Sequence, residues 1–290
     1  MSSQITTSFV EQYKNNVQLL SQSMGSKLRG AVDVETIQAN NAFFEQIGAT
    51  AAIKRTSRHG DTPQIDTPHA RGRVSLEDYE WADLIDTTDK VRMLIDPTSS
   101  YAKAAAAAMG RAMDDVIIDA LGGSAQTGVS GATATVLPAA QKPFSSSQSD
   151  GMTVAKLLTA KKLMDAADVD PSIKRYVVVS PTQIQDLLNT TEVKSSDFNT
   201  VKALAQGSIN SFLGFDFIMS NRLKLDATNA DDRLCYAFTQ DAIKLAIGKD
   251  VMAKISERAD KSYSTQVYYC MSIGSVRMEE VKVVEIACDE

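Results

Sequence analysis

The sequence predicts a mixed α+β fold in which one long helix accompanies several short strands. Residues 97–121 are alanine-rich and predict the long helix. In the C-terminal half, apolar runs of strand length alternate with helical patterns, which predicts a sheet with covering helices. Residues 54–73 combine glycine, proline and charge, which predicts a projecting loop. Together these features indicate an α+β protein with an exposed extension.

The first predicted element is an amphipathic helix near the N-terminus. Its apolar residues recur at intervals of three or four positions: Phe9, Tyr13, Val17, Leu20 and Met24. Such a stripe covers one side of a helix and needs a partner, and Gly25 ends the pattern. Residues 32–48 follow, with Phe43, Phe44 and Ile47 as their only large apolar anchors. We expect them to form an extended arm with short helical pieces.

A loop with an unusual charge pattern comes next. Residues 54–73 have almost no large apolar side chains but contain turn-forming glycines and prolines and both histidines. Its basic residues outnumber its two acidic residues, Asp61 and Asp66. The basic residues are Lys54, Arg55, Arg58, Arg71 and Arg73. An acidic run follows directly: Glu77, Asp78, Glu80, Asp83, Asp86 and Asp89. A basic tract therefore adjoins an acidic one.

The long helix has clear start and stop signals. Asp96 is suited to cap it, Pro97 fits the first helical position, and Gly122 with Gly123 stops it. At 1.5 Å per residue the helix is about 35–38 Å long, so it can act as a beam. The predicted apolar face is Tyr101, Ala105, Ala108, Ala112, Val116 and Ala120, with Met109, Met113 and Ile117 beside it.

The remaining elements belong to a compact α/β segment and a closing sheet. Residues 124–150 are predicted to be loop with one weak strand. Helices are expected at 153–167 and from Pro181 onwards. Strands are expected at 175–180, 215–220, 234–238, 243–247, 267–271 and 281–285. The chain therefore ends as sheet.

Length and composition limit the classes of function. The 290 residues fit one elaborate domain or two modest ones, and 43% hydrophobic residues can form a real core. Thirty basic against 36 acidic residues give a net charge of −6, which disfavours tight nucleic-acid binding. No apolar stretch approaches the roughly 20 residues of a membrane span, and residues 1–8 lack a secretion signal. We expect a cytosolic protein that does not enter membranes.

The cysteines and histidines suggest no metal site. Cys235, Cys270 and Cys288 are widely spaced without a C-x-x-C pair, so we expect reduced, mostly core thiols. His59 and His69 lack the spacing that places two imidazoles on one helical face. The order of the acidic run does not match a calcium-binding loop. An enzyme that uses a metal or phosphate around these histidines and the acidic run stays open as an alternative.

No catalytic, cofactor or metal-binding residue is assigned. Residues 123–130 nearly match a phosphate-binding loop, but Val129 stands where the lysine is needed, and a helix precedes the segment instead of a strand. No G-x-S-x-G motif is present, and no serine or cysteine has cues that place it beside a histidine. The sequence favours a protein that is not an enzyme.

Five segments, taken in order, carry a resemblance to a known family. They are GDTPQIDTPHARGRV (60–74), DYEWADLIDTTDKVRMLIDPTS (78–99), GRAMDDVIIDALGG (110–123), RYVVVSPTQIQDLL (175–188) and LGFDFIMSNRL (213–223). The chain resembles the major capsid proteins of tailed bacteriophages, which share the Hong Kong 97 fold, over nearly its whole length. The resemblance implies an icosahedral shell that encloses a double-stranded DNA genome. A nanocompartment shell of the same fold stays open as the alternative.

The resemblance also implies how the chain is organised. It divides the sequence into an N-terminal arm (1–46), an extended E-loop region (47–92), a peripheral domain with the spine helix (93–151), an axial domain (152–248) and a return to the peripheral sheet (249–290). Relatives that carry their own scaffold have a long N-terminal extension. Here only about 45–50 residues precede the loop, so a separate scaffolding protein is implied.

Partners and location follow from the same resemblance. The implied partners are further copies of the chain, as pentamers and hexamers in a closed shell, and a portal; a decoration protein is allowed. DNA would be enclosed without sequence-specific binding, no cofactor or membrane is involved, and the protein would reach the virion after assembly in the host cytoplasm.

Contacts between subunits are expected at two places. The basic loop residues Arg55, Arg58, Arg71 and Arg73 are expected to meet carboxylates of the next subunit. The carboxylates nearest by composition are Glu77, Asp78, Glu80 and Asp83. The apolar stripe of Phe9, Tyr13, Val17 and Leu20 is expected to pack on a neighbour.

Overall fold

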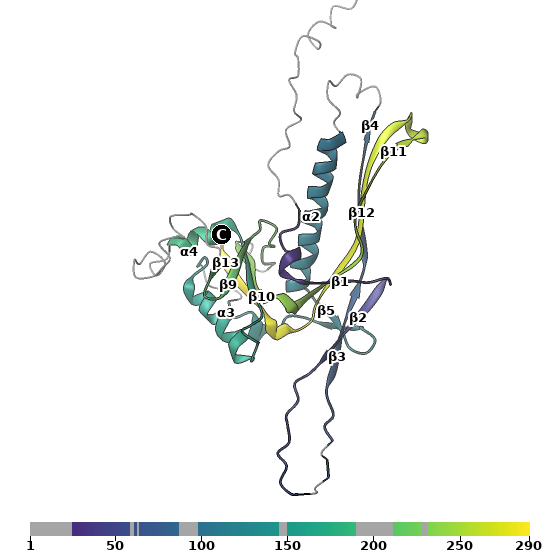
Figure 1. Cartoon of the computed structure of the whole chain (residues 1–290). Coiled ribbons are helices and arrows are strands. Elements are labelled where there is room, and N and C mark those ends of the chain that lie inside the picture. Colours follow the sequence, from purple (N-terminus) through teal and green to yellow (C-terminus); the bar gives the residue numbers. More distant parts are fainter. Residues whose placement is uncertain are drawn as a thin grey trace, which may run out of the picture. The chain divides into compact units, whose positions relative to one another are not determined.

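The computed structural model describes residues 25–58, 61–62, 64–86, 98–144, 150–189, 211–227 and 231–290. The chain forms two compact units. The first comprises Met1–Ser26, Asp78–Ala112 and Lys249–Ser272, and the second Lys27–Glu77, Met113–Gly248 and Ile273–Glu290. Three α-helices lie in the described part: α2 (Thr98–Gly122), α3 (Val154–Ala166) and α4 (Pro181–Asn189). With the sheets described next, they confirm the predicted mixed fold class (Figure 1).

Three sheets are formed by the described strands. The strands are β1 (Asp33–Thr36), β2 (Asn41–Ile47), β3 (His69–Ser75), β4 (Glu77–Ile85), β5 (Ala125–Thr127), β6 (Thr133–Thr135), β7 (Arg175–Val179), β8 (Ser211–Phe212), β9 (Phe215–Met219), β10 (Asp232–Thr239), β11 (Ile243–Arg258), β12 (Ser264–Arg277) and β13 (Val283–Asp289). Their orders are β1-β11-β12-β4, β13-β10-β7-β9-β8 and β2-β3-β5-β6.

The α/β segment agrees closely with the sequence prediction. The predicted strands at 175–180, 215–220 and 234–238 are β7, β9 and β10, and α4 begins at Pro181 as expected. In the sheet, β7 pairs parallel with β9 and antiparallel with β10, and β13 closes the other side of β10. Strands β7, β10 and β13 of this sheet bury near-continuous apolar runs, which the sequence pattern reveals.

The expectation of an arm with short helical pieces at 32–48 was wrong. These residues form β1, which pairs parallel with β11, and β2, which pairs antiparallel with β3. Only a single turn of 3-10 helix, Arg29–Ala31, precedes them. The partner of β1 lies more than 200 residues away, at Lys244 to Ile247. Local periodicity carries no information about such a partner, so the two strands were missed.

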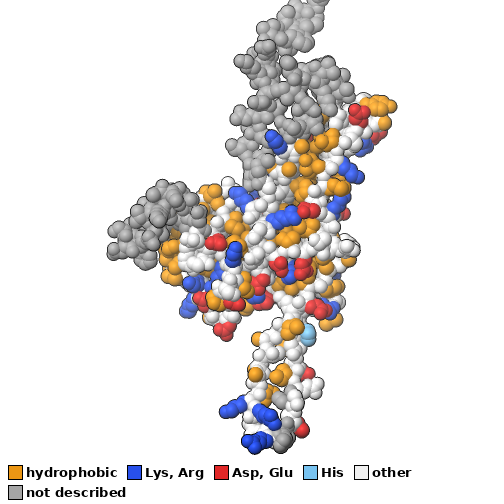
Figure 2. Space-filling model, viewed as in Figure 1, with side chains coloured by type: hydrophobic (Ala, Val, Ile, Leu, Met, Phe, Trp, Pro, Cys, Tyr) orange, Lys and Arg blue, Asp and Glu red, His pale blue; other side chains and the backbone are white. Residues whose placement is uncertain are grey.

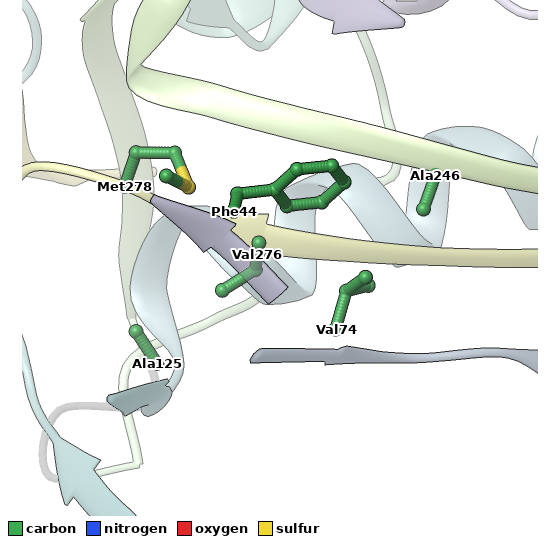
Figure 3. Close-up of a cluster of buried hydrophobic side chains, with 6 residues drawn as sticks. All are labelled: Phe44, Val74, Ala125, Ala246, Val276 and Met278. Atoms are coloured by element: carbon green, nitrogen blue, oxygen red, sulfur yellow. The ribbon is translucent and has the colours of Figure 1, made fainter. Parts of the chain in front are cut away.

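A small apolar cluster holds the β2–β3 pair against β11 and β12. Its buried members are Phe44, Val74, Ala125, Ala246, Val276 and Met278 (Figure 3). Of the three predicted anchors in this region, Phe44 is only 9% exposed, whereas Phe43 is 43% and Ile47 70% exposed. The base of the β2–β3 hairpin is therefore fixed by core packing.

The buried face of α2 is shifted to one side of the predicted one. Its large buried side chains are Met109, Met113 and Ile117, which were predicted to lie beside the apolar face, together with Ile118 and Leu121. Of the six residues assigned to the face itself only Ala105 is buried; Tyr101, Ala108, Ala112, Val116 and Ala120 are partly exposed. A run of alanines gives almost no contrast between the sides of a helix, so the larger side chains decide which side is buried. The proposed start signals, Asp96 and Pro97, lie outside the described residues.

Two buried charged side chains attach other segments to α2. The guanidinium of Arg277 is fully buried and donates to the carbonyls of Leu121 at 3.0 Å and Gly123 at 2.7 Å. The carboxylate of Asp114 accepts the backbone N–H groups of Lys27 at 3.0 Å and Leu28 at 3.1 Å. Both arrangements satisfy main-chain groups that would otherwise be buried without partners.

The expectation of core thiols is confirmed, because Cys235, Cys270 and Cys288 are all free and buried. The hydrogen bond to the neighbouring Cys288 thiol, together with burial, raises the pKa of Cys235.

None of the helices in the described part of the chain is long and apolar enough to cross a membrane.

Candidate functional site

The candidate site is the β2–β3 hairpin and the loop that joins its strands. The register runs from Asn41 opposite Ser75 to Ile47 opposite His69, and a further bond joins Gly48 N to Pro68 O at 2.8 Å. Beyond this bond, every described residue of the loop 48–68 is exposed. Figure 1 shows the loop extending away from β2 and β3. The predicted projecting loop (54–73) is confirmed for its described residues up to Pro68, whereas the last five predicted residues, His69 to Arg73, belong to strand β3.

The far end of this loop is basic. Lys54, Arg55 and Arg58 are all exposed, and Figure 2 shows basic side chains gathered there. Arg55 Nε donates to the carbonyl of Ser57 at 2.9 Å, which turns the chain locally. Among the described residues, none of the three has a carboxylate within ion-pair distance. We call Lys54, Arg55 and Arg58 the loop tip.

The two arginines near the hairpin base have partners within the chain. Arg71 Nη2 lies 2.6 Å from Glu45 Oε1, because the register places these residues directly opposite each other. Its guanidinium also stacks 5.5 Å from the ring centre of Phe43. Arg73 Nη2 donates to Asn41 Oδ1 at 3.3 Å. Glu45 and Asn41 were not among the predicted contact residues, because the sequence pattern does not reveal β2 and therefore gives no register between β2 and β3.

Four residues of the predicted acidic tract lie on β4, whereas Asp86 follows the strand and Asp89 lies outside the described residues. Glu77, Asp78 and Glu80 are exposed, and Asp83 is partly exposed. Tyr268 Oη donates to Glu80 Oε1 at 2.7 Å, and this bond is the main cause that raises the pKa of Tyr268. Ser272 Oγ donates to Asp78 Oδ1. Two carboxylates on one face of β4 are therefore held by hydroxyl groups of β12.

A shallow groove lies beside the hairpin base. It has a volume of about 580 Å³ and is lined on different sides by His69, Arg71, Val129 and Glu280, among others. Val129 is 87% exposed at the turn between β5 and β6. His69 is the one described histidine, and it begins β3. No group of three His, Cys, Asp or Glu side chains in the described ranges could hold a metal ion.

Comparison with known proteins identifies the family. The sequence model of a family described as phage capsid protein matches residues 5–290. The chain belongs to the phage capsid protein family. It is a shell-forming major capsid protein, and this membership implies self-assembly and a place in the virion. A search of curated protein sequences found no match.

Solved structures support the Hong Kong 97 fold for this capsid protein. The capsid of Ralstonia phage GP4 has a TM-score of 0.71 at 12% identity, with 97% of this chain and 95% of that chain covered. The capsid of cyanophage P-SCSP1u has a TM-score of 0.70 at 16% identity, with 95% and 92% covered. A structure from Mycobacterium phage Che8 has a TM-score of 0.69 at 17% identity, with 96% of each chain covered. At these identities the likeness concerns the fold alone.

The remaining predicted residues of the capsid protein fall in two groups. Phe9, Tyr13, Val17, Leu20 and His59 lie outside the described residues. Residues 123–130 form β5 and the turn that leads to β6, where Gly128 has φ +88°. A phosphate-binding loop requires a strand before it and a helix after it, and this segment has the reverse surroundings. Family and fold point to a structural role.

Proposed function

We propose that this capsid protein assembles as pentamers and hexamers into the icosahedral shell of a tailed phage and encloses double-stranded DNA. The observation that carries the proposal is the loop 48–68, whose described residues are all exposed while its base is fixed by the Phe44 cluster. An extended, polar loop gains nothing from this exposure in a free subunit. In a closed array it can lie on the next copy and define the register between subunits.

The loop tip and β4 are the proposed partners in this contact. The basic side chains of Lys54, Arg55 and Arg58 would meet Glu77, Asp78, Glu80 and Asp83 of a neighbouring subunit. Tyr268 and Ser272 each use only part of the hydrogen-bonding capacity of Glu80 and Asp78, so these carboxylates can still accept from arginine. One exposed pair contributes about 0.2–1 kcal/mol, but the pairs repeat at every subunit.

Arg71 and Arg73 take a different part in the proposal. Their partners Glu45 and Asn41 lie on the adjacent strand, so these arginines stiffen the base of the hairpin. A stiff base reduces the conformational entropy that the loop loses on docking. Contacts of Arg71 and Arg73 with the next subunit stay a prediction, in addition to this role.

The N-terminal stripe is the second proposed contact. Phe9, Tyr13, Val17 and Leu20 repeat at helical spacing and would pack on a neighbouring subunit. Deletion of residues 2–24 should leave a soluble, folded core that assembles poorly or forms fragile shells. Circular dichroism and electron microscopy of the deletion variant separate this outcome from unfolding of the whole subunit.

The net charge supports the proposed genome. A net charge of −6 suits a container for packed DNA, because a wall that bound phosphates tightly would hinder packaging and release. A separate scaffolding protein and a portal are the proposed partners, with a decoration protein as a further candidate. Assembly would take place in the host cytoplasm, without cofactor or membrane.

Charge reversal at the loop tip tests the proposed contact. The double variant Arg55→Glu/Arg58→Glu should lower particle yield while the melting temperature of the subunit stays unchanged. The matched control, Lys162→Glu/Lys174→Glu, has the same change in charge at exposed sites outside the loop and should assemble normally. Raising the salt concentration should mimic the loop variant, since screening acts over about 8–10 Å. Unchanged yield and salt tolerance would refute this pairing.

Two further measurements test the partner and the cargo. Reversal of Glu77 and Glu80 to lysine in the Arg55→Glu/Arg58→Glu background should restore particles in part. Nuclease-protected DNA in particles from infected cells supports the phage shell, whereas an enclosed enzyme without DNA supports the nanocompartment alternative.

A further inference from the structure

The outer half of β11 is an open sheet edge in the described part of the chain. Its first residues, Lys244 to Ile247, pair with β1, and β12 lies on the other side. Beyond Ile247, the residues 248–257 are exposed except for Met252, which is partly exposed. Val251 is 38% and Ile255 55% exposed. An open edge with apolar side chains is a ready template for another strand.

The direction in which the backbone N–H and C=O groups of β11 point follows from the last hydrogen bond on its β1 side. Ile37 N donates to Ile247 O at 3.0 Å, so the groups of Ile247 point away from β12. Directions alternate along a strand, and the groups of the odd-numbered residues 249–257 therefore point to the open edge. Val251 N–H donates to Oδ1 of the adjacent Asp250 at 2.8 Å. An amide on this edge is thus satisfied locally instead of by a strand.

The same odd-numbered residues form a self-complementary series of side chains. In order along one face they are Lys249, Val251, Ala253, Ile255 and Glu257. If a second copy of the series runs antiparallel beside the first, lysine lies opposite glutamate, valine lies opposite isoleucine, and alanine lies opposite alanine. Cross-strand pairs of this kind stabilise antiparallel sheets.

We propose that β11 pairs antiparallel with β11 of a second copy, around a twofold axis that passes beside Ala253. Lys249 then lies opposite Glu257 of the partner subunit, and Val251 opposite Ile255 of the partner subunit. Each contact occurs twice, which is the isologous pattern of a twofold interface. The inference rests on the proposed function, because a shell supplies the second copy, and it names a contact separate from the loop tip.

The other registers are less favourable. A twofold axis perpendicular to a sheet keeps each face on its own side, so opposed residues must both be odd or both be even. Centring the axis on Lys254 places two lysines opposite each other, which is destabilising. Centring it on Met252 places Lys249 opposite Ile255 and separates the apolar pair. The Met252 register does pair Asp250 with Lys254 and Met252 with itself on the even-numbered face. On the odd-numbered face, which carries Val251 and Ile255, only the register centred on Ala253 pairs both opposite charges and branched apolar side chains.

Cysteine cross-linking tests the pairing and its register. Opposed residues that exchange hydrogen bonds have Cα atoms about 5.5 Å apart, within the range of a disulfide. Ala253→Cys should therefore form a disulfide-linked dimer with oxidised glutathione. At Met252 or Lys254 the two equivalent Cα atoms would be about 8 Å apart, so Met252→Cys and Lys254→Cys should not link. The native cysteines are buried and give a low background.

A charge exchange provides a second, independent test. Lys249→Glu should weaken self-association of unassembled subunits roughly tenfold, since two exposed ion pairs per dimer become repulsive. The double variant Lys249→Glu/Glu257→Lys restores opposite charges in each pair and should recover wild-type association. Sedimentation of the three proteins measures the effect. Equal weakening by the single and double variants would overturn the pairing.

The outcomes distinguish this inference from the proposed function. Closed wild-type particles with no link at Ala253→Cys would overturn the β11 pairing and leave the shell intact. A link only at Met252→Cys or Lys254→Cys would overturn the stated register. If the Ala253→Cys variant forms a disulfide only with a cysteine of a different protein, β11 pairs with that protein, and the proposed pairing with a second copy would be overturned.

Discussion

Arg277 shows how a single buried charge can complete the end of a helix. The last carbonyls of α2 have no intrahelical partners, and the guanidinium of Arg277 donates to those of Ala120 and Leu121 and to the carbonyl of Gly123 directly after the helix. It also donates to Thr135 O at 3.0 Å, which ties β6 to the helix end. Burial lowers the pKa of Arg277, but an arginine stays protonated at neutral pH.

Replacement of Arg277 should therefore destabilise the folded subunit. Arg277→Met leaves several buried carbonyls without donors and should lower the free energy of unfolding by about 2–4 kcal/mol. Arg277→Lys keeps the charge but not the fork of donors and should cost less. The control Arg258→Met removes an exposed pair with Asp260 and should lower the free energy of unfolding far less than Arg277→Met. Urea unfolding of unassembled subunits measures all three, and equal losses at both sites would contradict this role.

Asp241 predicts a dependence of stability on pH. Burial alone raises its pKa, but hydrogen bonds from Lys282 and Thr239 outweigh this and lower the pKa below the ordinary 3.8. A lowered pKa in the folded state contributes stability above the unfolded pKa, and this is lost as pH falls through the folded pKa. The stability difference between wild type and Asp241→Asn should stay constant from pH 8 to 5 and shrink below about pH 3.8. A difference that grows with acidity would contradict this assignment.

At the scale of elements, the sequence predicts those whose pattern is local. The start of α4 at Pro181 and the apolar run of β7 needed no knowledge of tertiary contacts. The strands β1 and β2 were missed because their stabilising partners are β11 and β3, and a register cannot be read from composition. For the same reason, the ion pair between Arg71 and Glu45 could not be predicted, since it depends on the register of β2 and β3.

The long helix is the element on which a proline test is most informative. Ala106 lies in α2 and is exposed, so substitutions there affect the backbone more than the packing. Ala106→Pro should cost about 3 kcal/mol and yield misfolded or non-assembling subunits, whereas Ala106→Gly should cost about 1 kcal/mol and still assemble. Unfolding curves and particle counts give the readout. Normal particle yields from the proline variant would refute a role of α2 as a beam.

At the scale of the whole molecule, two surfaces find no partner within the described part of the chain. The loop tip carries three basic side chains on an extended loop, and β11 ends in an open edge with a self-complementary series of side chains. Neither surface has a structural role in an isolated subunit. Both are explained together when many copies of one chain meet in a closed shell, which is the function of the family to which the chain belongs.

Electron microscopy of the purified full-length protein over a range of concentrations, with sedimentation in parallel, tests this account most directly. The protein should form curved assemblies of many copies, as closed shells, or as tubes and open sheets where a scaffolding protein is lacking. These assemblies should disappear in high salt and in the Arg55→Glu/Arg58→Glu variant. A folded protein that remains monomeric at every concentration and salt would contradict the account.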